Sequence, residues 1–272
     1  MTIISRSLLV GAALLAGSVT VTQAADLGGS MKDYAAPVAP RVQYSPSSWY
    51  IRGDAGYGWH DEPSIVERNT LFETDNVRNS IQNTWTLGGG IGYYLTSHVR
   101  GDLTLDYRFK SEVTGTNADV GNPDFIPGKR KFDLSSTVGL ANLYYDFGHR
   151  AHFSPYVGAG IGFAVNKTSS GTISDFDSTV NPTGGAIAGA TKTDLAVALM
   201  AGFTHQFRQD LALDAGYRFL YLGKAETGAV TGNFYNGAVP PVLTAGGTNG
   251  LQISDLHAHE LRVGLRYDLG GR

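Results

Sequence analysis

Residues whose types and spacing could support chemistry gather near the C-terminal end of the 272-residue chain. His257 and His259 are two positions apart, so on an extended strand their imidazoles share one face and could ligate a metal ion or a haem iron. Ser254, His257 and Glu260 have the residue types of a hydrolytic triad. Solvated polarity explains the histidine pair more simply, and no nucleophile elbow surrounds Ser254. We therefore expect no enzyme, no cofactor and no metal site, and keep His257 and His259 as ligand candidates.

The composition excludes several other chemistries. The chain has no cysteine, which rules out a disulfide framework, thiol catalysis and thiolate metal sites. Its formal net charge of -3 gives no basis for a nucleic-acid partner. Glycine-rich runs at 88–90 and 158–162 resemble phosphate loops, but such loops need a helix after them. These glycines recur inside alternating apolar stretches, which indicates small residues within strands.

The elements that position the chemical groups are predicted to be strands, because eight stretches alternate apolar and polar residues with a period of two. These stretches are 49–60, 85–95, 99–110, 132–147, 156–165, 194–207, 211–219 and 260–269. The fourth is less regular, since Val138 and Leu140 are out of phase with Leu143. This break predicts a β-bulge near Asn142.

The connections between these strands alternate in length. Short ones lie around Ser97, at 148–153 and at 208–210, whereas long polar ones span 61–81, 111–131, 166–193 and 225–255. Four long and three short connections, with both ends of the barrel on the short side, are typical of a transmembrane β-barrel. The predicted fold class is therefore all-β: an eight-stranded antiparallel transmembrane barrel, up-and-down, with four long extracellular loops.

The polar face of these strands is predicted to line the interior. Eight strands leave an interior just wide enough for side chains, which the many tryptophan, tyrosine, phenylalanine and leucine side chains would overfill. Those apolar residues therefore face lipid, and a soluble barrel with the opposite orientation is the disfavoured alternative. The predicted lumen charge network is Arg52, Asp54, Arg100, Asp102, Asp106, Arg108, Asp214, Arg218, Glu260, Arg262, Arg266 and Asp268. Both signs are nearly balanced, so these groups can pair.

Aromatic residues near the strand ends are predicted to form two interfacial girdles. They are Trp49, Trp59, Trp85, Tyr107, Phe109, Phe147, Phe207 and Tyr267.

The first residues predict export. Arg6 precedes an apolar run at 8–16, and small residues follow up to Ala24, as in a signal peptide that is cleaved after that residue. We expect a signal peptide at 1–24, a flexible periplasmic leader at 25–48 and an outer-membrane barrel at 49–269. The predicted location is the cell outer membrane.

Several motifs resemble a known family. They are QAADL at 23–27, WYIRGDAGYG at 49–58, NLYYDF at 142–147 and PYVGAGIG at 155–162. With these the chain resembles the small outer-membrane barrel proteins of alphaproteobacteria, the porin-like surface-antigen family of rhizobia and their relatives. The resemblance implies the barrel fold throughout but no single activity, since the family mixes structural, adhesive, ligand-binding and weakly pore-forming members.

The last strand carries a second resemblance. Gly264, Tyr267 and Leu269 are spaced as in the terminal-strand signal that the barrel assembly machinery reads. Such signals usually end on an aromatic residue, whereas this chain continues with Gly270-Gly271-Arg272. We expect recognition by that machinery through the last strand.

The functional expectation is a structural barrel that stabilises the envelope and presents surface loops for interaction. A narrow pore or a ligand-uptake channel, haem included, stays open as the alternative, with a lipid-modifying barrel enzyme behind it. The expected partners are outer-membrane lipid and lipopolysaccharide, the assembly machinery, and a host or surface ligand for the loops. No nucleic-acid partner is expected.

Overall fold

The structure, a computed structural model, describes residues 49–67, 75–118, 128–148, 153–175, 184–235, 243–248 and 250–269. All regular elements in these ranges are strands. The described part of the chain holds no helix long and apolar enough to span a membrane. The predicted signal peptide at 1–24 and leader at 25–48 lie outside the described residues.

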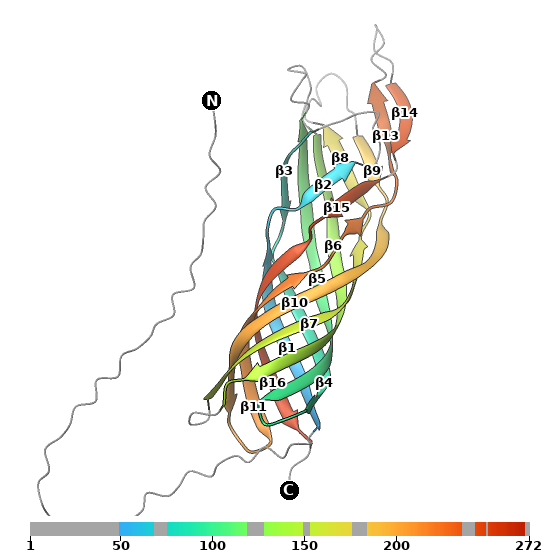
Figure 1. Ribbon diagram of the computed structural model, residues 1–272. Helices are drawn as coiled ribbons and strands as arrows, with labels where there is room; N and C mark the ends of the chain where they lie inside the picture. The colour runs from blue at the N-terminus through green and yellow to red at the C-terminus, as the bar shows by residue number, and fades with distance from the viewer. Residues whose placement is uncertain are drawn as a thin grey trace, which may run out of the picture. The chain divides into compact units, whose positions relative to one another are not determined.

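Eight long strands form a closed antiparallel barrel (Figure 1). They are β1 (Trp49–His60), β4 (Thr84–Tyr94), β5 (Val99–Ala118), β6 (Gly128–Asp146), β7 (Phe153–Thr168), β10 (Ala190–Gln206), β11 (Leu211–Tyr221) and β16 (His257–Asp268). Each pairs with the next, and β16 pairs back with β1, so the sheet has no edge at this level. The predicted eight-stranded up-and-down barrel is confirmed.

The long connections contain further strands that the period-two pattern did not identify. They are β2 (Ser64–Glu67), β3 (Asp75–Ile81), β8 (Gly171–Asp175), β9 (Gly184–Ile187), β12 (Ala225–Glu226), β13 (Val230–Tyr235), β14 (Leu243–Thr248) and β15 (Leu251–Ser254). Five of them prolong the wall beyond the barrel, in the order β3-β5-β6-β8-β9-β13-β14. The other three, β12, β15 and β2, form a separate three-stranded sheet.

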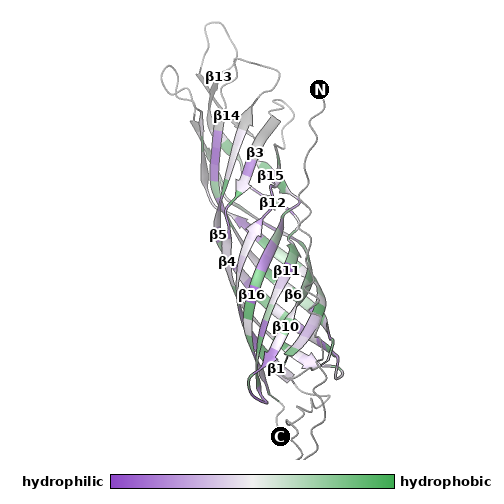
Figure 2. Cartoon of the chain, turned by 90° about the vertical axis from the view of Figure 1, so that its left-hand side faces the viewer, coloured by the Kyte–Doolittle hydropathy of each residue, from purple (hydrophilic) through white to green (hydrophobic). Residues whose placement is uncertain are grey.

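Side chains alternate between the two faces of the barrel wall. Hydrophobic and hydrophilic residues both occur along the barrel strands (Figure 2). On β5, Leu103 and Leu105 are 62% and 58% exposed on the outer face, whereas Thr104 and Asp106 between them are buried. An outer face this apolar is unfavourable in water and suits hydrocarbon. Closure suits hydrocarbon as well, because it leaves no unpaired strand edge in the barrel.

The predicted bulge near Asn142 is wrong. Asn142 pairs in continuous register with Asp102 on β5 and with Gly160 on β7. The register instead shifts on β5, between Arg108 and Ser111. The position of the bulge thus differs by one strand from the prediction.

The prediction failed because it assumed that apolar residues on β6 face lipid. Val138 and Leu140 point into the barrel and are buried, while Leu143 points outward and is exposed. The strand therefore keeps one phase throughout. Its inner face becomes apolar toward the extracellular end, where the lumen itself is apolar.

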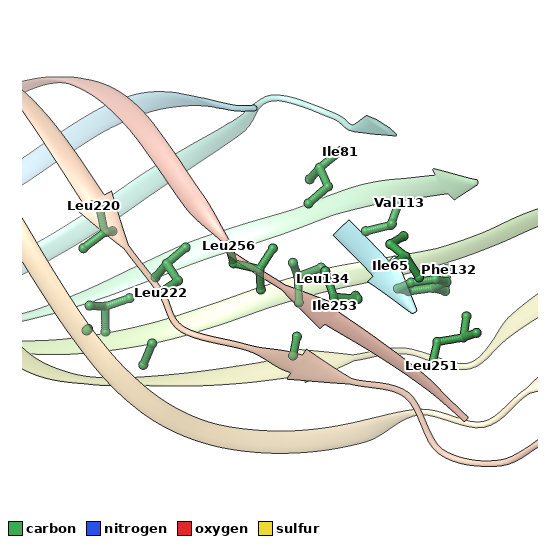
Figure 3. Packing of buried hydrophobic residues seen from close by; sticks show 14 of the residues in the cluster. Ile65, Ile81, Val113, Phe132, Leu134, Leu220, Leu222, Leu251, Ile253 and Leu256 are labelled. Atoms are coloured by element: carbon green, nitrogen blue, oxygen red, sulfur yellow. The ribbon is translucent and has the colours of Figure 1, made fainter. Parts of the chain in front are cut away.

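The hydrophobic core lies inside the extracellular part of the barrel (Figure 3). Barrel strands contribute Val113, Phe132, Leu134, Val138, Leu140, Ala164, Ala196, Ala198 and Leu220. The long connections contribute Ile65, Ile81, Ile187, Leu222, Ala225, Val230, Leu251, Ile253 and Leu256. Residues from the loops thus fill space that the barrel wall encloses.

Candidate functional site: the lumen and its extracellular rim

The alternation of the strands turns the predicted charged residues toward the lumen. Nine of the twelve are buried, and Arg52, Arg262 and Asp268 are partly buried. They come from β1, β5, β11 and β16, which follow one another around the wall except that β4 lies between β1 and β5. β4 presents Gly88, Gly90 and other small residues there, which leaves room for the long side chains of its neighbours.

The central cluster is built around Asp106. Its carboxylate accepts hydrogen bonds from Arg218 at 2.5 Å and from Arg262 at 2.9 Å. Arg218 also donates to Glu260 at 2.6 Å, and Glu260 forms a second ion pair with Arg108. Each of these carboxylates therefore serves two guanidinium groups, which offsets the cost of burying them.

A second cluster joins β1 to β5 and β6. Arg52 donates two hydrogen bonds to Asp54, at 2.6 and 2.8 Å, and a third to Asp102 at 2.9 Å. Asp102 also accepts from the Tyr50 hydroxyl at 3.1 Å and from the Asn142 amide at 2.7 Å. The polar atoms of this cluster are thus shared by charged and neutral partners.

A third group closes the end of the lumen near the short turns. Arg266 pairs with Asp214 at 3.1 Å, and Arg100 pairs with Asp146 at 3.1 Å. The guanidinium of Arg100 also lies over the Tyr144 ring, 4.3 Å from its centroid, a cation–π contact.

Other residues at this end complete the group. Asp268 accepts a hydrogen bond from the Tyr94 hydroxyl at 3.2 Å. Thr204 donates to Asp214 at 2.5 Å.

Sequence reasoning missed the uncharged members of these clusters and the members that lie on β6. Tyr50, Tyr144, Asn142 and Asp146 all occupy inward positions and contact the predicted charges. Tyr50 has the same inward parity as Arg52 and Asp54 on its strand, so the alternation could have identified it. The other three lie on β6, whose phase the prediction misjudged.

Little space remains between these side chains. A cavity of about 20 Å³ lies among them, lined by residues that include Arg52, Asp214 and Tyr156. A volume of this size holds about one water molecule. Side chains therefore fill the charged part of the lumen.

The three-stranded sheet of β12, β15 and β2 fills the extracellular part of the lumen; we call it the plug. Ile65 of β2 pairs with Ile253 of β15, and both side chains are buried in the core of Figure 3. The plug is tied to the wall by polar contacts as well. Asn166 donates to the Leu222 carbonyl at 2.8 Å, and Thr168 donates to the Glu226 carbonyl at 2.8 Å.

The two histidines that were ligand candidates lie outside the lumen, at the extracellular rim. The Nε2 atoms of His257 and His259 lie 2.9 and 3.2 Å from the same oxygen of Asp61. The His259 ring also stacks on Trp59, with centroids 5.8 Å apart. Among the described residues, no group of three or more His, Cys, Asp or Glu side chains is arranged to hold a metal ion.

The structure does not assemble the triad that Ser254, His257 and Glu260 could have formed. Glu260 points into the lumen and pairs with arginines there. His257 contacts Asp61 on the other side of the wall.

The predicted girdle residues lie on the outer face. Trp49, Trp85, Tyr107, Phe109, Phe147, Phe207 and Tyr267 are exposed there, and Trp59 is half-buried beside His259. Of the candidate assembly signal, Tyr267 and Leu269 are exposed outward. Gly264 faces inward, where a Cβ would lie 2.2 Å from an oxygen of Asp54.

Comparisons with known proteins agree with this architecture. A family profile described as "Outer membrane protein beta-barrel domain" matches residues 11–268. An uncharacterised protein of Brucella abortus is 31% identical over 261 residues, which cover 84% of this chain and 87% of the relative. A putative adhesin of Rickettsia prowazekii is 25% identical over 234 residues, covering 82% and 88%.

The chain is also similar to solved structures. The crystal structure of the outer membrane protein OprG from Pseudomonas aeruginosa matches 81% of this chain and 96% of its own, at 12% identity and a TM-score of 0.47.

Proposed function

Because this chain belongs to the family of outer-membrane β-barrel proteins, we propose that it is a structural barrel that seals its own lumen and presents its extracellular wall for interaction at the cell surface. The protein resides in the outer membrane, with lipid around its apolar face. The proposed sealing of the lumen rests on what fills it: ion pairs toward one end and apolar side chains toward the other.

The observation that carries the proposal is this double filling. Ion pairs such as Arg218–Asp106 occupy the lumen toward the short turns, and the apolar plug occupies it toward the long loops. A water path would have to separate the ion pairs and displace buried side chains such as Ile253. Separating a buried ion pair leaves an uncompensated charge, which makes such a path unfavourable.

The extracellular wall supports the second part of the proposal. β5 and β6 have 20 and 19 residues, about twice the 9–11 that cross a bilayer. They carry the wall strands β8, β9, β13 and β14 well away from the membrane. The Rickettsia relative is named as a putative adhesin, which favours a role of this wall in contact with another surface.

Conductance in planar bilayers tests the sealed lumen. The purified, refolded barrel should give no steady current step. A variant in which Ile65, Leu251 and Ile253 are changed to Ser should conduct no more than intermittently, since the charged part of the lumen stays closed. A steady porin-sized current from the wild-type protein, in a preparation free of porin, would overturn the sealed-lumen proposal and favour the pore.

Cell binding tests the surface role. Bacteria that display the wild-type barrel should bind host cells or extracellular matrix more than bacteria that display a barrel without residues 231–247 of the β13–β14 hairpin. This deletion keeps the core residue Val230, and the hairpin pairs with β9 and with no strand of the closed barrel, so the barrel should still fold. Equal binding by both strains, at equal surface amounts, would argue against a role for this hairpin.

A further inference from the structure

The contact of Asp61 with two histidines at the rim lies where both ends of the plug leave the barrel wall. Asp61 directly follows β1 and is three residues before β2. His257 begins β16 and is three residues after the end of β15. Because β2 pairs with β15 inside the barrel, the Asp61–His257 contact fastens together the two chain segments that enter the plug.

The hydrogen bonds of His257 require a positive charge on its ring. Its Nδ1 lies 2.7 Å from the backbone carbonyl of Asp255, which only accepts, so Nδ1 carries a hydrogen. A neutral ring would then have a lone pair on Nε2, and this lone pair would face the Asp61 carboxylate at 2.9 Å. Both contacts are attractive at once only if Nε2 is protonated too. His257 therefore makes both hydrogen bonds only as an imidazolium.

His259 differs in this respect. Its Nδ1 lies 2.5 Å from the Tyr217 hydroxyl, which can donate. A neutral His259 can thus accept from Tyr217 and donate from Nε2 to Asp61 at 3.2 Å. A neutral His259 thus keeps both of its hydrogen bonds, whereas a neutral His257 loses one of its two, either to Asp61 or to the Asp255 carbonyl.

The backbone next to His257 adds to this contrast. Asp255 has φ of 55°, in the left-handed region that a residue other than glycine adopts at a cost. Its carbonyl is held in place by the hydrogen bond from His257. Loss of the His257 proton therefore weakens either the contact with Asp61 or the hydrogen bond that holds this strained turn.

The surroundings of His257 contain few other charges. From β11, Tyr217 and Tyr221 face this cluster as neutral hydroxyls, and Tyr221 is the cross-strand partner of His257. From β1, His60 lies on the inner face and contacts Arg108. From β16 itself, Glu260 points inward to its arginines. The Asp61 carboxylate is thus the charge that meets the ring directly.

We propose that His257 and Asp61 form a proton-operated latch that holds the plug in the lumen. The latch is closed when the His257 ring is protonated and loosens when the ring loses that proton.

The pH range of the latch follows from its two partners. Partial burial alone would raise the pKa of the Asp61 carboxyl, but the hydrogen bonds and charge of His259 and His257 outweigh it and hold this pKa below its ordinary value. Asp61 is therefore charged at mildly acidic pH. The latch stabilises the plug while the His257 ring is protonated, weakens once a higher pH removes that proton, and fails again in acid strong enough to protonate Asp61.

Hydrogen exchange of the whole refolded barrel tests the latch. Peptides that cover 64–67 and 251–256 should be about threefold better protected at about pH 5 than at about pH 8, after correction for intrinsic exchange, as expected for a partly exposed ion pair. His257→Gln should remove this pH dependence, because a glutamine amide can donate to Asp61 at any pH. Asp61→Asn should remove it as well, by abolishing the carboxylate.

His205→Gln is the matched control, because His205 lies on β10 near the short turns and packs on Phe207 there. It should keep the wild-type pH dependence. Protection of the plug peptides that does not change with pH in the wild-type protein would overturn the proposal. So would a His257→Gln variant that keeps the wild-type change. Because Gln and Asn are close in size to the residues they replace, both variants should fold, which the shift of the folded band on unheated gels checks.

Discussion

At the scale of single residues, Asp106 shows how the lumen tolerates charge. Its carboxylate is fully buried, yet it receives hydrogen bonds from Arg218 and Arg262. Such an arrangement adds little net stability compared with an apolar filling, but removing one member leaves the others uncompensated. The loss of a single charged residue should therefore destabilise the barrel more than the replacement of a whole ion pair by apolar residues.

Asp106→Ala should lower the free energy of unfolding by about 3–5 kcal/mol, because the buried Arg218 and the partly buried Arg262 lose their shared carboxylate. Urea unfolding of the barrel in detergent measures this. Asp210→Ala is the control: Asp210 lies in the exposed turn before β11 and pairs only with Arg208 among the described residues, so its loss should cost less than about 1 kcal/mol. Equal effects of the two substitutions would contradict a buried network.

Leu105→Arg should impair insertion, because an arginine at mid-strand facing hydrocarbon costs about 2–4 kcal/mol. Leu105 lies on the outer face of β5, 58% exposed there. Thr114→Arg, on the same face of the same strand but beyond the predicted lipid-facing segment, should be tolerated. The fraction of protein that gains the folded gel mobility in lipid vesicles compares them. An orientation with the apolar face inward predicts the reverse order.

The face of the wall toward which each residue points could be predicted from the sequence more reliably than the residues that it contacts. All twelve charged positions follow from alternation, since a strand presents every second side chain to one face. The pairing of Arg262 with Asp106 could not be predicted, because it depends on the stagger of strands 156 residues apart. The rim contact of Asp61 with His257 was missed for the same reason.

At the scale of elements, the inner face of β4 presents small residues, which leave room for the charged cluster. A Cβ on Gly88 would lie 1.8 Å from an oxygen of Asp106, so the charged cluster occupies the space that a larger residue would need. Gly53, across from β4 on the outer face of β1, has nothing within 4 Å of such a Cβ. A residue larger than glycine thus has no room on the inner face at Gly88, whereas the outer face at Gly53 leaves space for one.

Gly88→Val should prevent the central cluster from closing and should strongly reduce the yield of folded barrel. Gly53→Val should fold like the wild-type protein, since it only adds an apolar group on the lipid-facing side. Refolding yield by gel mobility and circular dichroism of both variants tests the difference. Normal refolding of Gly88→Val would show that Asp106 can shift without cost.

Elements of four residues or fewer in the plug were beyond prediction. The paired residues of β2 and β15 are 184 or more positions apart in the sequence, and β12 has two residues. Their apolar residues, such as Ile65 and Ile253, resemble the scattered apolar residues of any polar loop. The apolar inner face of β6 was the one available signal, and it was misinterpreted as a bulge.

At the scale of the whole molecule, the export signal remains a prediction. Cleavage after Ala24 places small residues on both sides of the cut, so the mature chain should begin at Ala25. Mass spectrometry of the protein purified from outer membranes measures its N-terminus. A mature chain that starts before residue 20 would contradict the predicted cleavage site.

The placement of the charges on β16 has a consequence for assembly. Glu260 and Arg262 lie on the last strand, and they pair across the lumen with Arg108 and Asp106 of β5, whereas Arg266 pairs with Asp214 of the neighbouring β11. The ion pairs between β16 and β5 therefore form only when the seam between β16 and β1 closes. A seam slipped by one residue would turn these three side chains toward lipid, and the penalty would fall on that faulty product. The buried charges thus make a misregistered seam less stable than the correct one.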